Sequence, residues 1–198
     1  MKCEGEKTYS KTGNCPECGM KLVNVKDLQA VPADSNSISD VSIFNLDSRW
    51  KTQDNNSFQL KDLQGNAFVV VMIYASCQAA CPRLVADVRN IRKDVENESV
   101  KYVFVSIDPE NDTPEKLTEF AKENDMYNEE SLFLTGSQED VLELANVLAV
   151  KYKEVSPMLF SHSNIISVFD KGGNLKYQRE GLGVNNTEII KEIKKLTS

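Results

Sequence analysis

Two cysteines, Cys77 and Cys81, are separated by three residues and directly follow the most apolar run of the chain, Ala67–Ala75. This run predicts a buried strand, and Pro82 is typical of the first turn of a helix. At a strand-to-helix turn, the first N–H groups of the helix lack partners within it, and the helix dipole favours negative charge. The thiolate is the reactive and metal-binding form of cysteine, so this position makes the pair a candidate site.

The chemistry of the pair has three interpretations. Two small buried apolar side chains are the least favoured, because structural cysteines rarely occupy a turn that stabilises thiolates. A redox dithiol is the second, although thioredoxin-type enzymes have two residues between their cysteines rather than three. A metal site with two thiolate ligands is the third. A peroxidase is disfavoured because Cys77 lacks the preceding Thr and Pro pattern of a peroxidatic cysteine.

His162 is the only histidine of the chain and precedes an expected strand at Asn164–Phe169. In a thioredoxin-like sheet that strand lies beside Ala67–Ala75, and the loop before it faces the cysteine turn. We therefore expect His162 to lie beside Cys77 and Cys81. Two thiolates and an imidazole suit Cu(I), and Cu(II) if a further ligand joins. Three protein ligands with an open position equally suit zinc.

The remaining pattern predicts an α/β protein: an N-terminal β-hairpin, then alternating strands and helices, then a hairpin around Asp170–Asn174 and a final helix. This order is typical of a thioredoxin-like sheet with helices on both faces. The expected strands are Ser42–Leu46, Ser57–Leu60, Ala67–Ala75, Val100–Ile107, Leu132–Leu134, Asn164–Phe169 and Leu175–Gln178. The expected helices are Pro82–Asn97, one capped by Asp112 with Pro114 in its first turn, Ser137–Leu148 capped by Ser137, and one starting at Asn186-Thr187.

Composition excludes several classes of function. The 198 residues carry a net charge of −7 without a basic cluster, which disfavours nucleic acid and anionic membranes as partners. No apolar stretch approaches the ~18 residues of a membrane span, and no export signal is visible. Five cysteines cannot all be paired within one chain, and they form two groups.

The first group of cysteines predicts a separate metal-binding module. Residues 1–24 contain Cys3, Cys15 and Cys18 among few large apolar residues, so this segment needs a metal or a partner to fold. Together with Met20, these thiols favour a soft ion, although half of a zinc ribbon is an alternative. Residues 25–40 are rich in Ser, Asp and Asn and indicate a linker to a main domain at 41–198.

The main domain resembles the Sco/SenC family of thioredoxin-like copper proteins. The resemblance rests on three matching pieces, which are Cys77-xxx-Cys81-Pro82, the run from Ser106 to Pro114, and His162 before Ser163-Asn-Ile-Ile. It implies a metallochaperone that binds copper through Cys77, Cys81 and His162 and passes it to cytochrome c oxidase subunit II or another acceptor. It also implies a linked disulfide-reducing role and an extracytoplasmic, membrane-tethered location.

This chain departs from the family pattern at two places. Gln78-Ala79-Ala80 replaces the usual Pro-Asp-x between the cysteines, and Ser161 replaces an acidic residue before the histidine. Asp108 and Asp112 remain candidates for orienting the site, although capping of the next helix explains Asp108 equally well. The main alternative function is a thiol–disulfide oxidoreductase without a physiological metal, and a pure interaction module is a third class.

The N-terminal segment resembles a small heavy-metal-binding domain, through the run Cys-Pro-x-Cys-Gly-Met-x-Leu at residues 15–22. Met1-Lys2-Cys3 resembles the end of an upstream Cys-Pro-Met segment of that family. The resemblance implies zinc or copper at Cys3, Cys15, Cys18 and Met20.

Overall fold

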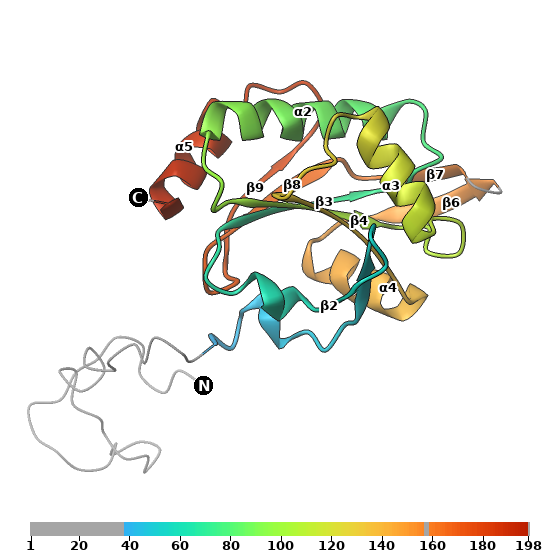
Figure 1. The fold of residues 1–198 in the computed structure, drawn as a ribbon, viewed down its shortest axis with the longest axis horizontal. Helices are drawn as coiled ribbons and strands as arrows, with labels where there is room; N and C mark the ends of the chain where they lie inside the picture. The colour runs from blue at the N-terminus through green and yellow to red at the C-terminus, as the bar shows by residue number, and fades with distance from the viewer. Residues whose placement is uncertain (1–37, 157–158, 198) are drawn as a thin grey trace, which may run out of the picture. The chain divides into compact units, whose positions relative to one another are not determined.

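A computed structural model describes residues 38–156 and 159–197 of the chain (Figure 1). The predicted module at 1–24, with Cys3, Cys15, Cys18 and Met20, lies outside the described residues. So do residues 25–37 of the predicted linker.

The described residues are built around a seven-stranded sheet with the order β2-β1-β5-β4-β3-β8-β9. Strands β3, β4 and β5 are parallel, whereas β1, β8 and β9 each run antiparallel to their neighbours. Every residue of β3 is buried, as its continuous apolar run predicts. The strands are β1 (Trp50–Thr52), β2 (Ser57–Phe58), β3 (Phe68–Ile73), β4 (Lys101–Ser106), β5 (Ser131–Gly136), β8 (Ile165–Phe169) and β9 (Leu175–Glu180).

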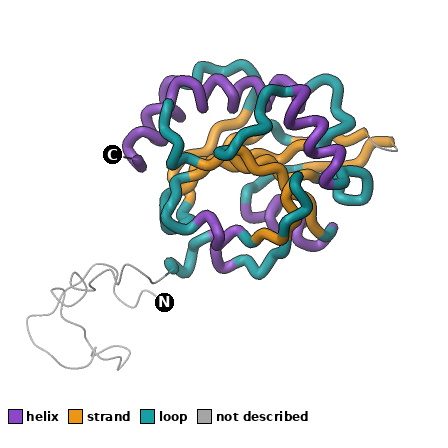
Figure 2. Tube along the Cα trace, in the orientation of Figure 1, coloured by secondary structure: helices purple, strands orange, loops and turns teal. Residues whose placement is uncertain are grey.

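Helices cover both faces of this sheet (Figures 1 and 2). The crossovers from β3 to β4 and from β4 to β5 place α2 (Ala80–Val95) and α3 (Pro114–Glu123) on one face (Figure 1). Helix α5 (Thr187–Thr197) packs beside α2, and α4 (Gln138–Val147) covers the opposite face. The α/β class with helices on both faces is therefore as predicted.

The N-terminal hairpin differs from the prediction. Residues 42–46 are not a strand but contain the 3₁₀ helix η1 (Ile43–Asn45). The Ser42 hydroxyl accepts the Phe44 N–H at 3.2 Å and donates to the Gly172 carbonyl at 2.7 Å, which turns the chain. The hairpin pairs β1, which the pattern missed, with β2, and Leu60 begins a second 3₁₀ helix, η2 (Leu60–Leu63), rather than ending a strand.

The segment before β8 is also different from the expected loop. It forms a separate two-stranded ribbon of β6 (Tyr152–Ser156) and β7 (Leu159–His162), which extends from the body of the molecule in Figure 1. Tyr152 pairs with His162 at the base of this ribbon. His162 thus ends a strand, and only Ser163 and Asn164 separate it from β8.

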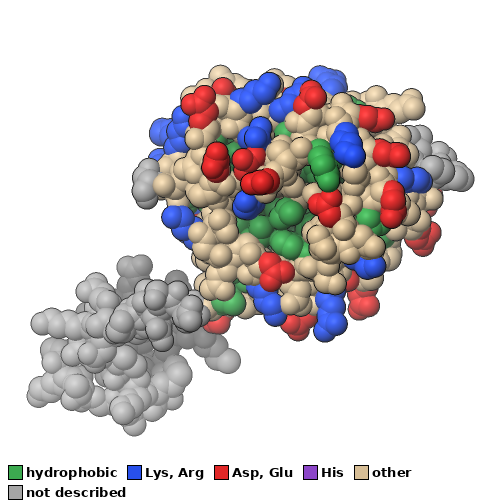
Figure 3. Space-filling view, viewed as in Figure 1, with side chains coloured by type: hydrophobic (Ala, Val, Ile, Leu, Met, Phe, Trp, Pro, Cys, Tyr) green, Lys and Arg blue, Asp and Glu red, His purple; other side chains and the backbone are tan. Residues whose placement is uncertain are grey.

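The surface agrees with the absence of a basic cluster in the sequence. On the face shown in Figure 3, acidic and basic side chains are interspersed rather than gathered by sign. Within the part of the chain that the structure describes, no helix is both long enough and apolar enough to cross a membrane.

Candidate metal centre

The cysteine turn is built by the end of β3 and the start of α2. The Cys77 N–H donates to the Tyr74 carbonyl at 3.2 Å, which closes the turn. The N-cap residue of α2, Ala79, has no side-chain acceptor. Its place is taken by the Cys77 sulfur, which accepts the Cys81 N–H at 3.4 Å. One sulfur therefore faces the free N–H groups and positive dipole end of α2.

Pro82 is compatible with this helix start. Helix α2 begins at Ala80, so Pro82 is its third residue. The first N–H groups of a helix have no acceptor within it, and the missing N–H of Pro82 therefore costs no hydrogen bond. The helix begins two residues earlier than predicted, and Cys81 lies inside its first turn.

His162 lies against the second sulfur. Its Nε2 atom is 3.5 Å from Cys81 Sγ, and its Nδ1 atom is 3.1 Å from the Ser163 carbonyl oxygen. A carbonyl can only accept, so this contact assigns the proton to Nδ1. The Nε2 lone pair then faces the sulfur, and this is the form in which a neutral imidazole binds a metal.

The two thiols have opposite acid–base properties. Donation from Cys81 to the Cys77 sulfur, together with backbone N–H groups, lowers the pKa of Cys77 to about 4. The same hydrogen bond and burial raise the pKa of Cys81. Cys77 is 8% exposed, whereas Cys81 is fully enclosed at 0%. The pair therefore consists of a slightly exposed thiolate and a fully enclosed thiol.

Tyr74 was not singled out from the sequence but lies at the centre of the site. Its N–H donates to Cys81 Sγ at 3.5 Å, and its hydroxyl donates to the Phe160 carbonyl of β7 at 3.1 Å. Burial, followed by interaction with the Cys77 sulfur, raises its pKa to about 12. Its place three residues before Cys77 was the available signal, but an apolar strand that ends in an aromatic residue is too common to indicate a role.

The two acidic candidates lie behind the turn. Asp112 is 1% exposed and accepts the Ala75 N–H at 3.0 Å and the Ser106 hydroxyl at 2.6 Å. Burial raises its pKa. The predicted cap of α3 is wrong by one residue, because Thr113 is the N-cap and Asp112 supports the cysteine turn instead. Asp108 accepts both of its side-chain hydrogen bonds from Asn111, within its own loop.

The site is not a preassembled metal cage. Within residues 38–156 and 159–197, no group of three His, Cys, Asp or Glu side chains is arranged closely enough to hold an ion. The Cys77 sulfur accepts the Cys81 N–H, and the Cys81 sulfur contacts His162 Nε2. Closing the three side chains around an ion thus requires them to move.

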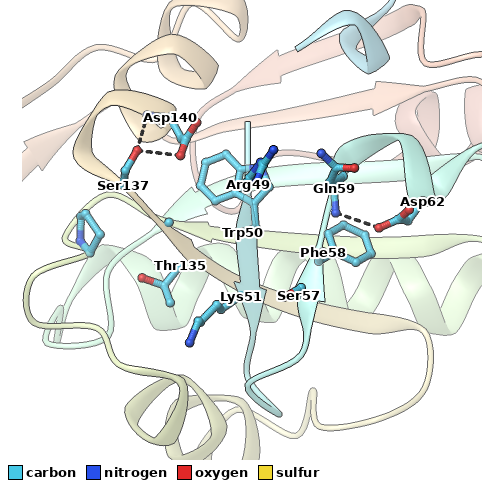
Figure 4. Close-up of a pocket in the computed structure, with 12 residues that line it drawn as sticks. Arg49, Trp50, Lys51, Ser57, Phe58, Gln59, Asp62, Thr135, Ser137 and Asp140 are labelled. Atoms are coloured by element: carbon cyan, nitrogen blue, oxygen red, sulfur yellow. Dashed lines mark hydrogen bonds between the residues drawn. The ribbon is translucent and has the colours of Figure 1, made fainter. Parts of the chain in front are cut away.

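A separate pocket of about 750 Å³ lies between the β1–β2 hairpin and the start of α4 (Figure 4). Buried Trp50 forms part of its wall, and Arg49, Lys51, Asp62 and Asp140 supply charges of both signs. None of its lining residues is a cysteine or histidine. The thiol chemistry of the described residues is therefore confined to the turn after β3.

This arrangement defines the class of protein. The central strand of an α/β sheet leads into a dithiol at the start of a helix, and a histidine from the segment before the neighbouring antiparallel strand faces that dithiol. The chain belongs to the SCO1/SenC family, whose model matches residues 42–198. The model of the heavy metal binding domain matches residues 1–25.

Relatives support this assignment. The SCO1 protein homolog of Bacillus subtilis is 30% identical over 154 residues, which cover 73% of this chain and 78% of that protein. A SCO2-like protein of Rickettsia typhi is 24% identical over 129 residues, and the match spans 61% of this chain but only 62% of that protein.

Solved structures confirm the thioredoxin-like Sco fold. A SCO1/SenC family lipoprotein from Bacillus anthracis gives a TM-score of 0.71 at 25% identity, over 78% of this chain and 96% of that one. BsSco, described as a member of the Sco family of cytochrome c oxidase assembly proteins with a disulfide switch, gives 0.67 at 25% identity, over 75% and 90%. Arabidopsis thaliana ScoI, solved with copper bound, gives 0.67 at 22% identity, over 76% and 95%.

Proposed function

We propose that this chain is a copper metallochaperone that binds one copper ion as cargo through Cys77, Cys81 and His162. The observation that carries the proposal is the 3.5 Å approach of His162 Nε2 to Cys81 Sγ, beside a second thiol. Two thiolate sulfurs are soft donors that favour Cu(I), and an imidazole also suits copper. The copper-bound structure of the related Arabidopsis ScoI supports the same cargo.

The protonation of the site prepares it for this role. Cys77 is held as a thiolate, so it meets an incoming cation without first losing a proton. Cys81 is a thiol and has to release its proton when copper binds. The His162 tautomer is fixed by Ser163 before metal arrives.

The acceptor that we propose is the dinuclear copper centre of cytochrome c oxidase, in subunit II. It is supported by the relation to BsSco, which is named as a cytochrome c oxidase assembly protein. We further propose an extracytoplasmic, membrane-tethered location, supported by the related Bacillus anthracis lipoprotein. Asp108 and Asp112 are proposed to support the site from behind rather than to bind copper.

A second candidate function is thiol–disulfide exchange, which the lowered pKa of Cys77 favours. The Cys77 thiolate would attack a partner disulfide and release one partner thiolate, which takes up a proton. Cys81, after losing its proton, would attack the mixed disulfide, so that a Cys77–Cys81 disulfide forms and the partner is reduced to a dithiol. This function predicts fast turnover of a model disulfide together with weak copper binding.

The N-terminal segment is proposed as a separate module at residues 1–24, joined by a linker at 25–40 to the domain at 41–198. Cys3, Cys15, Cys18 and Met20 would bind zinc or copper there, which the heavy metal binding domain match supports.

The test is an anaerobic Cu(I) titration of the reduced full chain against a chromophoric chelator. A Cys15→Ser/Cys18→Ser variant removes the proposed N-terminal site, so that the remaining ion reports on the main domain. In that background we expect one tightly bound ion, and a loss of at least about tenfold in affinity from Cys77→Ser, Cys81→Ser or His162→Ala. Unchanged affinity in His162→Ala would remove histidine from the site. Weak Cu(I) binding by the unmutated domain, together with fast reduction of a model disulfide, would favour the exchange function.

A further inference from the structure

Tyr74 connects the central strand, the cysteine turn and the histidine ribbon. It directly follows β3, is 2% exposed, and contacts Cys81 and Cys77 through its own backbone. Its ring lies edge-on to the Phe160 ring at 5.3 Å between centroids, and edge-on to the His162 ring at 5.8 Å. The hydroxyl completes these contacts by donating to the Phe160 carbonyl.

The ribbon that carries His162 depends on such contacts. β6 and β7 form their own two-stranded sheet and share no strand pairing with the seven-stranded sheet. A two-stranded ribbon alone is only marginally stable in water. Among the described residues, its polar contacts with the rest of the domain include the Tyr74 hydroxyl, the Cys81–His162 pair, and a bond from Gln138 to the Tyr152 hydroxyl.

The position of the hydroxyl contact matters for the histidine. Residues two apart in a strand lie on the same face, so Phe160 and His162 both face the Tyr74 ring. The bond to the Phe160 carbonyl therefore holds β7 in place two residues before His162. Without that bond, ring packing, the Cys81–His162 contact and the Gln138–Tyr152 bond would remain to hold His162 beside the Cys81 sulfur.

We infer that Tyr74 is a positioning residue whose hydroxyl holds β7 so that His162 Nε2 faces the Cys81 sulfur. This inference rests on the proposed copper site, but the contacts exist without metal. The Tyr74 hydroxyl donates to the Phe160 carbonyl and also interacts with the Cys77 sulfur. Only the first of these contacts holds β7.

The first arm of the test needs no metal. His162 is the only histidine among the 198 residues, so its imidazole nitrogens give unambiguous NMR signals. In the reduced, metal-free full chain at a pH where the ring is neutral, we expect a single Nδ1–H tautomer for the wild type. Tyr74→Phe keeps the ring but removes the hydroxyl, and we expect broadened or averaged nitrogen signals. Signals identical to those of the wild type would overturn the inference.

Tyr102→Phe is the matched control. Tyr102 is also buried in the sheet. It lies near the start of β4, whereas Tyr74 follows the end of the parallel strand β3, and the Tyr102 hydroxyl has no hydrogen-bond partner. The same chemical change there should leave the His162 signals unchanged. Thermal unfolding of both variants checks that each remains folded.

The second arm measures Cu(I) affinity in a double-mutant cycle with His162→Ala. We expect Tyr74→Phe to weaken binding about 3- to 10-fold when His162 is present and clearly less when it is absent, where only its interaction with the Cys77 sulfur is lost. An equal loss in both backgrounds would show that Tyr74 does not act through His162 and would overturn the inference. If the wild type binds no Cu(I), the proposed function fails, and the metal-free arm alone decides the role of Tyr74.

Discussion

The Cys81 sulfur lies 3.5 Å from the His162 Nε2 atom, although 81 positions separate the two residues in the sequence. The sheet creates this proximity, because β8 pairs antiparallel with β3 and its beginning therefore lies beside the end of β3. Cys81 follows the end of β3, and His162 precedes the beginning of β8. Neither residue makes this site alone, and their pairing distinguishes it from a simple dithiol.

The unequal thiols predict selective alkylation. In the reduced, metal-free chain, Cys77 should react before Cys81, because it is a thiolate above about pH 4 and is the more exposed of the two. Its rate should be nearly flat between about pH 6 and pH 8, where an ordinary thiol speeds up about tenfold per unit. Peptide mapping by mass spectrometry after brief iodoacetamide treatment measures both sites.

Cys81→Ala supplies the control for this asymmetry. It removes the side-chain donor that is the largest cause of the lowered Cys77 pKa, so that pKa should rise. The Cys77 rate should then fall at about pH 6 and remain similar at about pH 9. An unchanged pH profile, or earlier alkylation of Cys81 in the wild type, would contradict the assignment of the thiolate.

Much of the fold was predictable because its signals are local. The apolar run of β3, the cap of α4 at Ser137 and the turn at Asp170–Asn174 each act over a few residues, and the structure confirms them. β1 was missed because Trp50–Thr52 is short, and its pairing with β5 depends on residues about 80 positions away. Ile43 and Phe44 suggested a strand, but both are buried, which the alternation of a half-buried strand does not allow.

The site was predictable in its residue types but not in its supports. The expectation that His162 lies beside the cysteines came from the strand order, and the structure places it there. Its ligand role stays a prediction. The ribbon β6–β7 and the hydrogen bond from the Tyr74 hydroxyl to the Phe160 carbonyl were missed. The hydrogen bond could not be predicted because its acceptor is a backbone carbonyl, which every residue type carries. The prediction of Asp112 rather than Thr113 as the cap of α3 was wrong for another reason, because both residue types are favoured N-caps.

Asp112→Asn should make the stability of the domain less dependent on pH. Burial raises the pKa of Asp112, so the folded state favours the neutral acid, and ionisation at higher pH costs stability. This contribution is present below the unfolded-state pKa and is lost as pH rises through the folded-state pKa. Asn keeps an oxygen to accept the Ala75 N–H and the Ser106 hydroxyl.

The measurement is the difference in melting temperature between Asp112→Asn and wild type across about pH 4 to pH 8. The difference should rise with pH and then level off. A difference that falls with increasing pH would mean that the folded state stabilises the ionised carboxylate.

Gly136→Ala should destabilise the pairing of β1 with β5. A Cβ atom at this position would lie 2.7 Å from Trp50 Cε3 and 3.1 Å from the Arg49 carbonyl oxygen. Trp50 is 2% exposed, and its indole N–H donates to the Ser48 hydroxyl at 3.0 Å, so the ring cannot easily move away. We expect a loss of about 1–3 kcal/mol in urea denaturation. In a Trp50→Leu background the same substitution should cost less, and an equal cost would exclude the clash as its cause.

Arg179→Met should loosen the loop between β9 and α5. The Arg179 guanidinium donates to the Val184 carbonyl at 2.9 Å, the Asn185 carbonyl at 3.2 Å and the Asn186 side chain at 2.6 Å. Asp87 of α2 lies 4.0 Å from it and also accepts the Gly183 N–H at 2.8 Å. One side chain thus gathers three consecutive residues of the loop against α2.

Arg179→Met should lower the free energy of unfolding by about 1–3 kcal/mol. The loss is limited because two guanidinium nitrogens of Arg179 have no hydrogen-bond partner in the folded protein, and because water can donate to the exposed carbonyls in its place. Hydrogen exchange should accelerate within residues 181–186, while β3 stays protected. Lys195→Met, at an exposed ion pair on α5, should change stability by less than about 0.5 kcal/mol. If exchange in the loop remained as slow as in the wild type, Asp87 and the backbone alone would hold the loop, and Arg179 would not be its anchor.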